Sequence, residues 1–338
     1  MGGNAINNAV RLNKDEYFTL CAEVLELLAP FMQMNDIRCK AIDAYRSKPT
    51  FGDMDIIVED NGTYIEWFDI INDVFHSKEI VHTKNSPVIS FEYKGFQIDL
   101  IFTTSKYYDF AVHYYSYNDI CNLIGRITDA MGFKFGHNGL WYHYKNLDEG
   151  IDEKFCMTTS FKDALEVFGF SYERFLQGFD TLEDIFLYIS TNKYFQPELY
   201  LLENINHQGR TRDKKRKTYQ EFLKYCQNIV ATESVHTFNR DSDFIYVAKF
   251  FPKIHIQLNN AKFIARTIKC AKQYFNAHEI VKHTGFSGKN LGFYIKATMD
   301  KFPDKFDWAV YCLASPHSEI LELMDKNYRE VINDKTTC

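Results

Sequence analysis

Apolar residues recur at helical spacing near the start of the chain. They predict an amphipathic helix over residues 15–32, because they fall on one stripe: Phe18, Cys21, Leu25, Leu28 and Phe31. From residue 37 the spacing shortens to the alternation that is typical of half-buried strands. The expected elements are strands at 37–44 and 53–59, a helix at 64–75, and a hairpin that joins 88–93 to 96–103 through Lys94 and Gly95.

Beyond residue 107 the pattern is mostly helical. One further hairpin is expected across His137, Asn138 and Gly139, since an Asn-Gly pair between apolar runs favours a tight turn. A sheet with helices in the first 100 or so residues, followed by a mainly helical C-terminal region, indicates an α+β protein.

Two expected strands carry acidic residues on their polar face. Asp53 and Asp55 alternate with apolar residues in 53–59, and Asp99 interrupts the apolar alternation of 96–103. Neighbouring strands would bring the three carboxylates together, and such oxygen clusters suit hard cations such as Mg²⁺. The alternative is that these are ordinary solvent-facing acids on an amphipathic sheet.

The loop before Asp53 strengthens the first interpretation. Residues 43–55 read Asp-Ala-Tyr-Arg-Ser-Lys-Pro-Thr-Phe-Gly-Asp-Met-Asp. This stretch resembles the polymerase-beta superfamily of nucleotidyltransferases, whose signature is Gly-Ser, a short basic loop and Gly-Asp-x-Asp, with a third Asp on a later strand. Asp99 fits the third position, but Asp43 and Ala44 stand where the family has Gly-Ser. By this resemblance the nucleotide-binding residues of the loop are Arg46, Ser47, Lys48 and Gly52.

The resemblance extends to the family X DNA polymerases over residues 35–200. Tyr114 and Tyr115, followed by a helix with Asn122 and Arg126, are similar to the family's aromatic pair and its nucleotide-contacting helix. Residues 132–142 resemble the thumb hairpin, and residues 181–199 the closing segment. Tyr114, Tyr115, Asn122 and Arg126 are therefore further candidates for contact with the nucleotide.

The resemblance implies a fold and an activity. It implies a nucleotidyltransferase palm domain at 1–110, a thumb-like region that binds nucleotide and acceptor at 111–204, and a helical C-terminal domain at 205–338. Asp53, Asp55 and Asp99 would be both the catalytic residues and the ligands of two Mg²⁺ ions, with Mn²⁺ as a substitute. The implied reaction transfers a nucleoside monophosphate from an NTP or dNTP to the 3′-hydroxyl of RNA or DNA and releases pyrophosphate.

Positive charge is concentrated in one segment of the C-terminal region. The whole chain has a net charge of −6, yet the eight residues 210–217 contain one acid and six basic residues: Arg210, Arg212, Lys214, Lys215, Arg216 and Lys217. Tyr219, Phe222 and Cys226 follow at helical spacing, so we expect a helix that is anchored on one face and basic on the other. Such a segment favours contact with nucleic-acid phosphates, although a solvated helix face is the ordinary alternative.

Composition narrows the class of protein. Hydrophobic residues make up 46% of the 338-residue chain and charged residues 25%, which is typical of a globular protein. Neither a membrane-length apolar run nor a secretory signal is found, so we expect no membrane partner and a cytoplasmic location. The eight cysteines show no CxxC pair and predict reduced thiols.

Two other functions remain open at this point. A transferase that adenylylates a protein or small molecule would use the same carboxylates, but it would leave the basic segment unexplained. A binding module without activity would not need the acids. In addition, the glycine-rich stretch 283–292 is either a phosphate-holding turn or a plain interhelical turn with glycine as the C-cap.

Overall fold

The computed structural model describes residues 5–62, 65–229 and 236–336. The chain folds into two compact units. Unit 1 contains residues 1–143 and 156–251, and unit 2 contains residues 144–155 and 252–338. The domain boundaries expected from the sequence, after residues 110 and 204, do not coincide with the limits of these two units.

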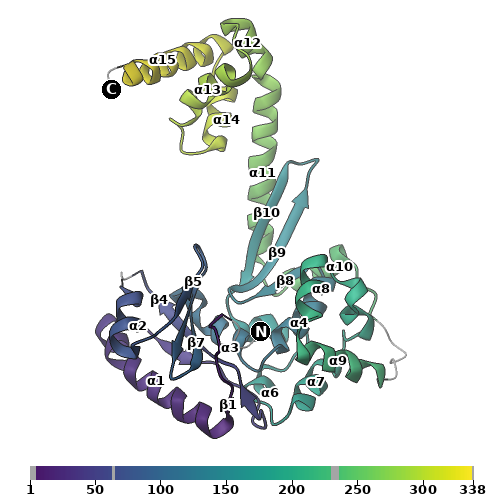
Figure 1. Cartoon of the computed structure of the whole chain (residues 1–338). Coiled ribbons are helices and arrows are strands. Elements are labelled where there is room, and N and C mark those ends of the chain that lie inside the picture. Colours follow the sequence, from purple (N-terminus) through teal and green to yellow (C-terminus); the bar gives the residue numbers. More distant parts are fainter. Residues whose placement is uncertain (1–4, 63–64, 230–235, 337–338) are drawn as a thin grey trace. The chain divides into compact units, whose positions relative to one another are not determined.

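Unit 1 is built around a mixed sheet, of which β4, β5 and β7 are labelled in Figure 1. The sheet has five strands in the order β2-β4-β7-β6-β5. Its strands are β2 (Cys39–Ala41), β4 (Asp53–Asp60), β5 (Ile80–His82), β6 (Val88–Tyr93) and β7 (Phe96–Thr104). Neighbours pair antiparallel except β4 and β7, which are parallel. The short strands β1 (Leu12–Asn13) and β3 (Thr50–Phe51) pair separately.

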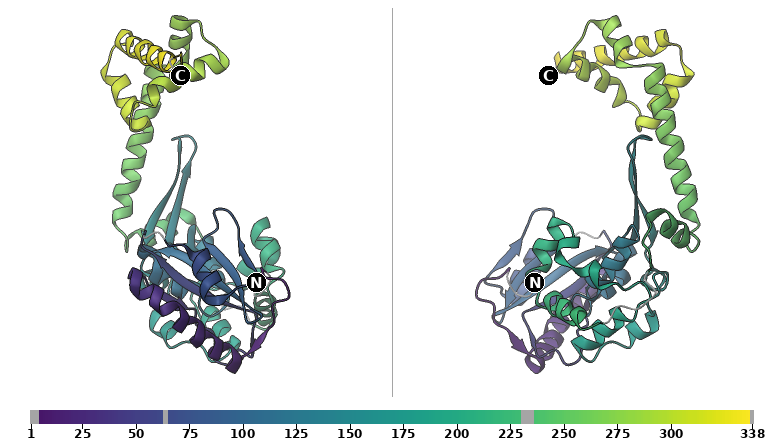
Figure 2. Two further views of the ribbon diagram at one scale, coloured as in Figure 1. Left: turned by 60° about the vertical axis from the view of Figure 1, so that its left-hand side comes forward. Right: turned by 90° about the vertical axis from the view of Figure 1, so that its right-hand side faces the viewer.

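The two faces of the sheet are covered differently. Helices α1 (Lys14–Asn35) and α2 (Trp67–Phe75) pack on the face that carries Met54, Ile56 and Leu100, and together they form the main apolar core. Figure 2 shows α1 running along this sheet. On the opposite face, α3 (Tyr108–Tyr115) packs on Ile57 and Ile101. The three acidic side chains of β4 and β7 that were expected to converge lie on this second face of the sheet.

The rest of unit 1 is mainly helical. Its helices are α4 (Ile120–Ala130), α5 (Phe161–Glu166), α6 (Tyr172–Leu176), α7 (Leu182–Ser190), α8 (His207–Asp213), α9 (Lys217–Gln227) and α10 (Arg240–Ala248), with short 3-10 helices at Ser105–Tyr107, Pro197–Tyr200 and Leu202–Asn204. A three-stranded sheet has the order β10-β9-β8, from β8 (Phe133–Gly136), β9 (Gly139–Asn146) and β10 (Ile151–Thr158).

Unit 2 contains the ends of β9 and β10 and five helices. They are α11 (Lys253–Tyr274), α12 (Ala277–Thr284), α13 (Gly288–Met299), α14 (Lys305–Ala314) and α15 (His317–Thr336). A separate apolar cluster holds the helices together and includes Phe275, Ile280, Tyr294, Ile320 and Met324. In the part of the chain that the structure describes, no helix is long and apolar enough to cross a membrane.

Most of the expected elements are present, with two corrections. The strand expected at 37–44 is shorter, Cys39–Ala41. It pairs with β4 at the edge of the sheet, where Ala41 lies opposite Ile56. The expected helix at 64–75 is α2, which begins at Trp67, and residue 64 lies outside the described residues. The mixed α+β class and the hairpin at residues 137–139 are confirmed.

Candidate active site

Parallel pairing of β4 with β7 brings the three acidic residues together. Asp55 lies opposite Asp99 in the register, and Asp53 lies opposite Gln97. Side chains two residues apart on a strand share a face, so all three carboxylates lie on the face away from α1 and α2. One carboxylate oxygen from each of the three residues lies within 4.8 Å of the other two. The convergence expected from the sequence is therefore present.

The environment of Asp55 and Asp99 opposes the ionisation of their carboxyl groups. Burial, and then the charges on Asp53 and Asp99, raise the pKa of Asp55 to about 8. Burial also raises the pKa of Asp99, although hydrogen bonds from Ser90 and Gln97 act in the opposite direction. Like charges held this close disfavour one another, and a bound cation would reverse that effect. Three carboxylates with this spacing fit a hard divalent cation, for which oxygen is the preferred ligand.

Gln97 orients the third carboxylate, and sequence reasoning did not identify it. Its Nε2 donates to both oxygens of Asp99, at 2.9 and 3.0 Å. Its Oε1 accepts from the backbone N–H groups of Ala5, at 2.9 Å, and Ile6, at 3.1 Å. These two donors fix which end of the amide faces Asp99. The available signal was the position of Gln97, two residues before Asp99 and hence on the same face.

Lys48 is the residue of the basic loop that interacts electrostatically with the acidic cluster. Burial lowers the pKa of the Lys48 ammonium, while the charges of Asp53 and Asp55 raise it. Its Nζ donates to Asn118 Oδ1 at 3.2 Å and lies 4.5 Å from the centre of the Phe51 ring. A partly buried cation that feels the charges of Asp53 and Asp55 is placed to meet a phosphate that the same site binds.

Arg46 and Ser47 are directed to another segment of unit 1. The Arg46 guanidinium pairs with Asp180 at 2.6 Å and also donates to the carbonyl of Gln177. The backbone N–H groups of Arg46 and Ser47 donate to the carbonyls of Phe179 and Asp180. Both residues, which were expected to bind the nucleotide, therefore already have hydrogen bonds to residues 177–180.

Gly52 and Tyr115 lie near the acidic cluster, whereas Tyr114 packs beside Phe135 and His137. Gly52 is buried and directly precedes β4. Tyr114 and Tyr115 lie at the end of α3, where Tyr115 stacks at 5.9 Å on His137. Burial, followed by the charge of Asp55, raises the pKa of Tyr115 to about 12, which places this ring within the electrostatic reach of the acids.

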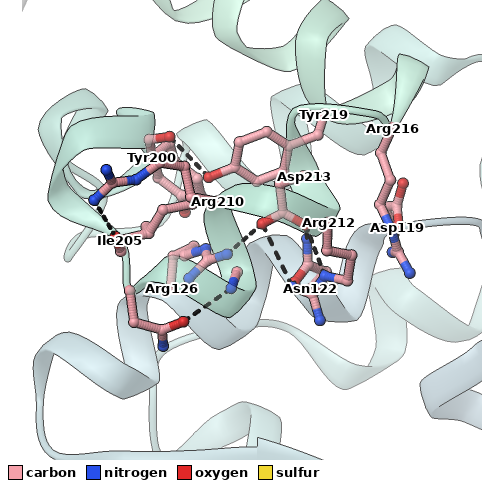
Figure 3. Close-up of polar contacts among 12 residues, drawn as sticks. Asp119, Asn122, Arg126, Tyr200, Ile205, Arg210, Arg212, Asp213, Arg216 and Tyr219 are labelled. Atoms are coloured by element: carbon pink, nitrogen blue, oxygen red, sulfur yellow. Dashed lines mark hydrogen bonds and ion pairs between the residues drawn. The ribbon is translucent and has the colours of Figure 1, made fainter.

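Asn122 and Arg126 lie on α4 and contact α8 (Figure 3). Both side chains donate to Asp213, Asn122 at 3.3 Å and Arg126 in a closer ion pair. Arg212 also pairs with Asp213, at 2.8 Å, and donates to Asn122. Asp213 is completely buried, so these contacts neutralise a charge that would otherwise be costly. Sequence reasoning missed Asp213, although it is the one acid in the basic segment.

The basic segment does not form the continuous helix expected from the sequence. Helix α8 ends at Asp213 and α9 begins at Lys217, with Arg216 in an extended conformation between them. The chain breaks here because Asp213 is anchored in the core and Arg216 turns to pair with Asp119. The predicted apolar anchors Tyr219, Phe222 and Cys226 are buried.

Half of the basic side chains are thereby occupied within the protein. Arg210 donates to the carbonyl of Ile205 at 3.1 Å, and Arg212 and Arg216 form the ion pairs described above. The exposed lysines of the segment are Lys214, Lys215 and Lys217. A polyanion would meet mainly these three lysines.

Comparison with known proteins adds no identification. No protein-family model matches the chain, and no curated protein matches it. The function is therefore argued from the site.

Proposed function

We propose that the chain is a metal-dependent nucleotidyltransferase that joins a nucleoside monophosphate, from an NTP or dNTP, to the 3′-hydroxyl of RNA or DNA and releases pyrophosphate. The observation that carries this proposal is the convergence of Asp53, Asp55 and Asp99 on adjacent parallel strands. The resemblance of the loop before Asp53 to the polymerase-beta superfamily supports the same reaction.

The acidic cluster is suited to hold two divalent cations. Bound Mg²⁺ or Mn²⁺ would supply the charge that activates a hydroxyl and stabilises a triphosphate. Asp53 and Asp55 project from one strand and would contact both ions, while Asp99 is presented by the neighbouring strand. Gln97 keeps the Asp99 carboxylate in one orientation, and Asp99 is the group placed to accept the proton of the attacking hydroxyl.

Other residues of unit 1 would position the nucleotide. Lys48 lies beside the acids and would bind the triphosphate as a point charge. Tyr115 borders the same face and offers an apolar ring to the sugar or base. Asn122 and Arg126 would contact the nucleotide only after exchanging their hydrogen bonds with Asp213.

A labelled-nucleotide assay tests the proposal. The protein is incubated with each α-labelled NTP or dNTP, Mg²⁺ or Mn²⁺, and oligonucleotides of RNA or DNA. We expect label on acceptors with a 3′-hydroxyl and none on matched acceptors that end in a 3′-deoxy sugar. Asp53→Asn should remove the activity, because it removes a shared metal ligand. Label that ignores the acceptor's 3′ end would overturn the proposal.

Adenylylation of a protein or small molecule is the second candidate. It gains support from the basic segment, since its three arginines already have hydrogen-bond or ion-pair partners within the protein. The same assay separates the two candidates. Label from ATP on a protein or small molecule, together with none on any oligonucleotide, would favour adenylylation.

A further inference from the structure

Unit 2 contains a cavity that the proposed reaction does not use. It has a volume of about 490 Å³ and lies among the end of α12, the turn that follows, α13 and α15. This volume falls in the range of sites that bind small organic groups. The glycine-rich stretch 283–292 forms one side of it, and Gly285 is the left-handed C-cap of α12, as in a plain interhelical turn.

Aromatic rings form the apolar part of the cavity. Phe286 and Tyr328 are partly exposed, with ring centres 5.5 Å apart, and Tyr294 lies behind them at 5.7 and 5.1 Å. Partly exposed rings beside an open cavity offer a flat surface on which a planar group can stack. Nucleobases are such groups, and stacking on tyrosine or phenylalanine is the usual way in which single strands are held.

The polar part of the cavity favours an anion beside that planar group. Asp325 is committed to the protein, because its Oδ2 pairs with His283 Nε2 at 2.9 Å and its Oδ1 accepts from the hydroxyl of Tyr294 at 2.8 Å. Although burial opposes ionisation, the hydrogen bonds from His283 and Tyr294 lower the pKa of Asp325. The carboxylate therefore serves to hold the imidazole. The exposed Arg329 also lines the cavity, and its charge acts on Asp325 as well.

Positive charge on another helix of unit 2 favours a nucleic-acid strand over a free nucleotide as the ligand. Helix α11 contains five basic residues and no acidic residue in 22 positions. Arg266 and Lys269 contact Glu149 and the carbonyl of Asp148, whereas Lys272 is exposed. Although α11 does not line the cavity, its exposed lysines add positive charge to the same unit, which favours a polyanion.

We propose that this cavity binds an unpaired nucleobase of a single-stranded nucleic acid, with the base stacked on Phe286 and Tyr328 and a neighbouring phosphate on Arg329 and His283. The proposal deepens the proposed function, on which it rests for the identity of the strand as the acceptor. Binding at the cavity is independent of the chemistry in unit 1.

The test measures binding of the full chain to fluorescein-labelled 12-nucleotide single strands of DNA and RNA, in EDTA and without nucleotide, so that no transfer occurs. We expect Phe286→Leu to weaken binding by about five-fold or more, since one stacked base is lost. Arg329→Gln should weaken binding and flatten its salt dependence. Lys326→Gln, an equal charge change on α15 outside the cavity lining, should leave binding close to wild type.

A crosslinking arm keeps the test decisive if Phe286→Leu fails to fold. Strands that contain 5-iodouracil are irradiated on the wild-type protein, and the crosslinked peptide should contain Phe286 or Tyr328. A blunt duplex should compete poorly because its bases are paired. Crosslinks confined to other segments, wild-type affinity of Arg329→Gln, or equal competition by the duplex or by free AMP would overturn the proposal. Strand binding at the cavity without any transfer would refute the proposed function alone.

Discussion

Replacing Asp55 by Asn should stabilise the metal-free protein. Burial and the charges of Asp53 and Asp99 raise the pKa of Asp55 from 3.8 to about 8. The folded state therefore binds a proton that the unfolded state releases, so wild-type stability falls as the pH rises from about 4 to 8. Asparagine has no such dependence, and the advantage of the variant should grow over the same pH range.

The magnitude follows from the two pKa values. Their difference corresponds to a ceiling of about 6 kcal/mol, which relaxation of the side chains and entry of water reduce. We expect Asp55→Asn to gain about 1–3 kcal/mol at pH 8 in EDTA, and less at pH 5. For a unit of this size that gain raises the unfolding temperature by about 2–10 °C. Asp73→Asn, at an exposed acid of α2, is the matched control and should change little.

Magnesium should invert the comparison. Excess Mg²⁺, at one hundred times its dissociation constant, should stabilise the wild type by about 2–3 kcal/mol, because the ion binds only the folded site. Scanning calorimetry measures this gain. Asp55→Asn should lose most of this gain. Equal stability of the two proteins in EDTA at pH 8, or an equal gain from Mg²⁺, would refute the assignment of the acidic cluster as a metal site.

Three further changes test other contacts of unit 1. Asp213→Asn should lower the free energy of unfolding by about 3–5 kcal/mol in urea titrations, because it leaves buried arginine charge uncompensated, and a loss below about 1 kcal/mol would contradict this. Gln97→Leu should raise the Mg²⁺ concentration for half-maximal transfer by about 10- to 100-fold, whereas an unchanged requirement would show that Asp99 needs no support. Replacing Lys214, Lys215 and Lys217 by glutamine should reduce the slope of log affinity against log salt concentration for strand binding by about two. An unchanged slope would show that these lysines are solvated side chains without phosphate contacts.

The sequence by itself determined the local features of the site. Alternation placed Asp53 and Asp55 on one face of a strand and Asp99 on the polar face of another, because side-chain direction in a strand depends only on the parity of the position. The existence of helix α1 and the turn at residues 137–139 were equally local, since a 3.6-residue period and an Asn-Gly pair act over a few residues. The predicted apolar stripe of α1 was only partly right, because Tyr17, Leu20 and Met32 are buried whereas Phe18 is exposed.

Only the tertiary structure decided which distant groups meet. The parallel register that sets Asp55 opposite Asp99 depends on the pairing of strands far apart in the chain, which no local pattern encodes. In the same way, the sequence favoured one basic helix in contact with nucleic-acid phosphates, whereas packing buries Asp213 and brings Arg126, Arg212 and Asn122 to it. Charge counted along a sequence shows how much is present, but the fold decides how much of it is neutralised, because a buried charge must find its partner within the protein.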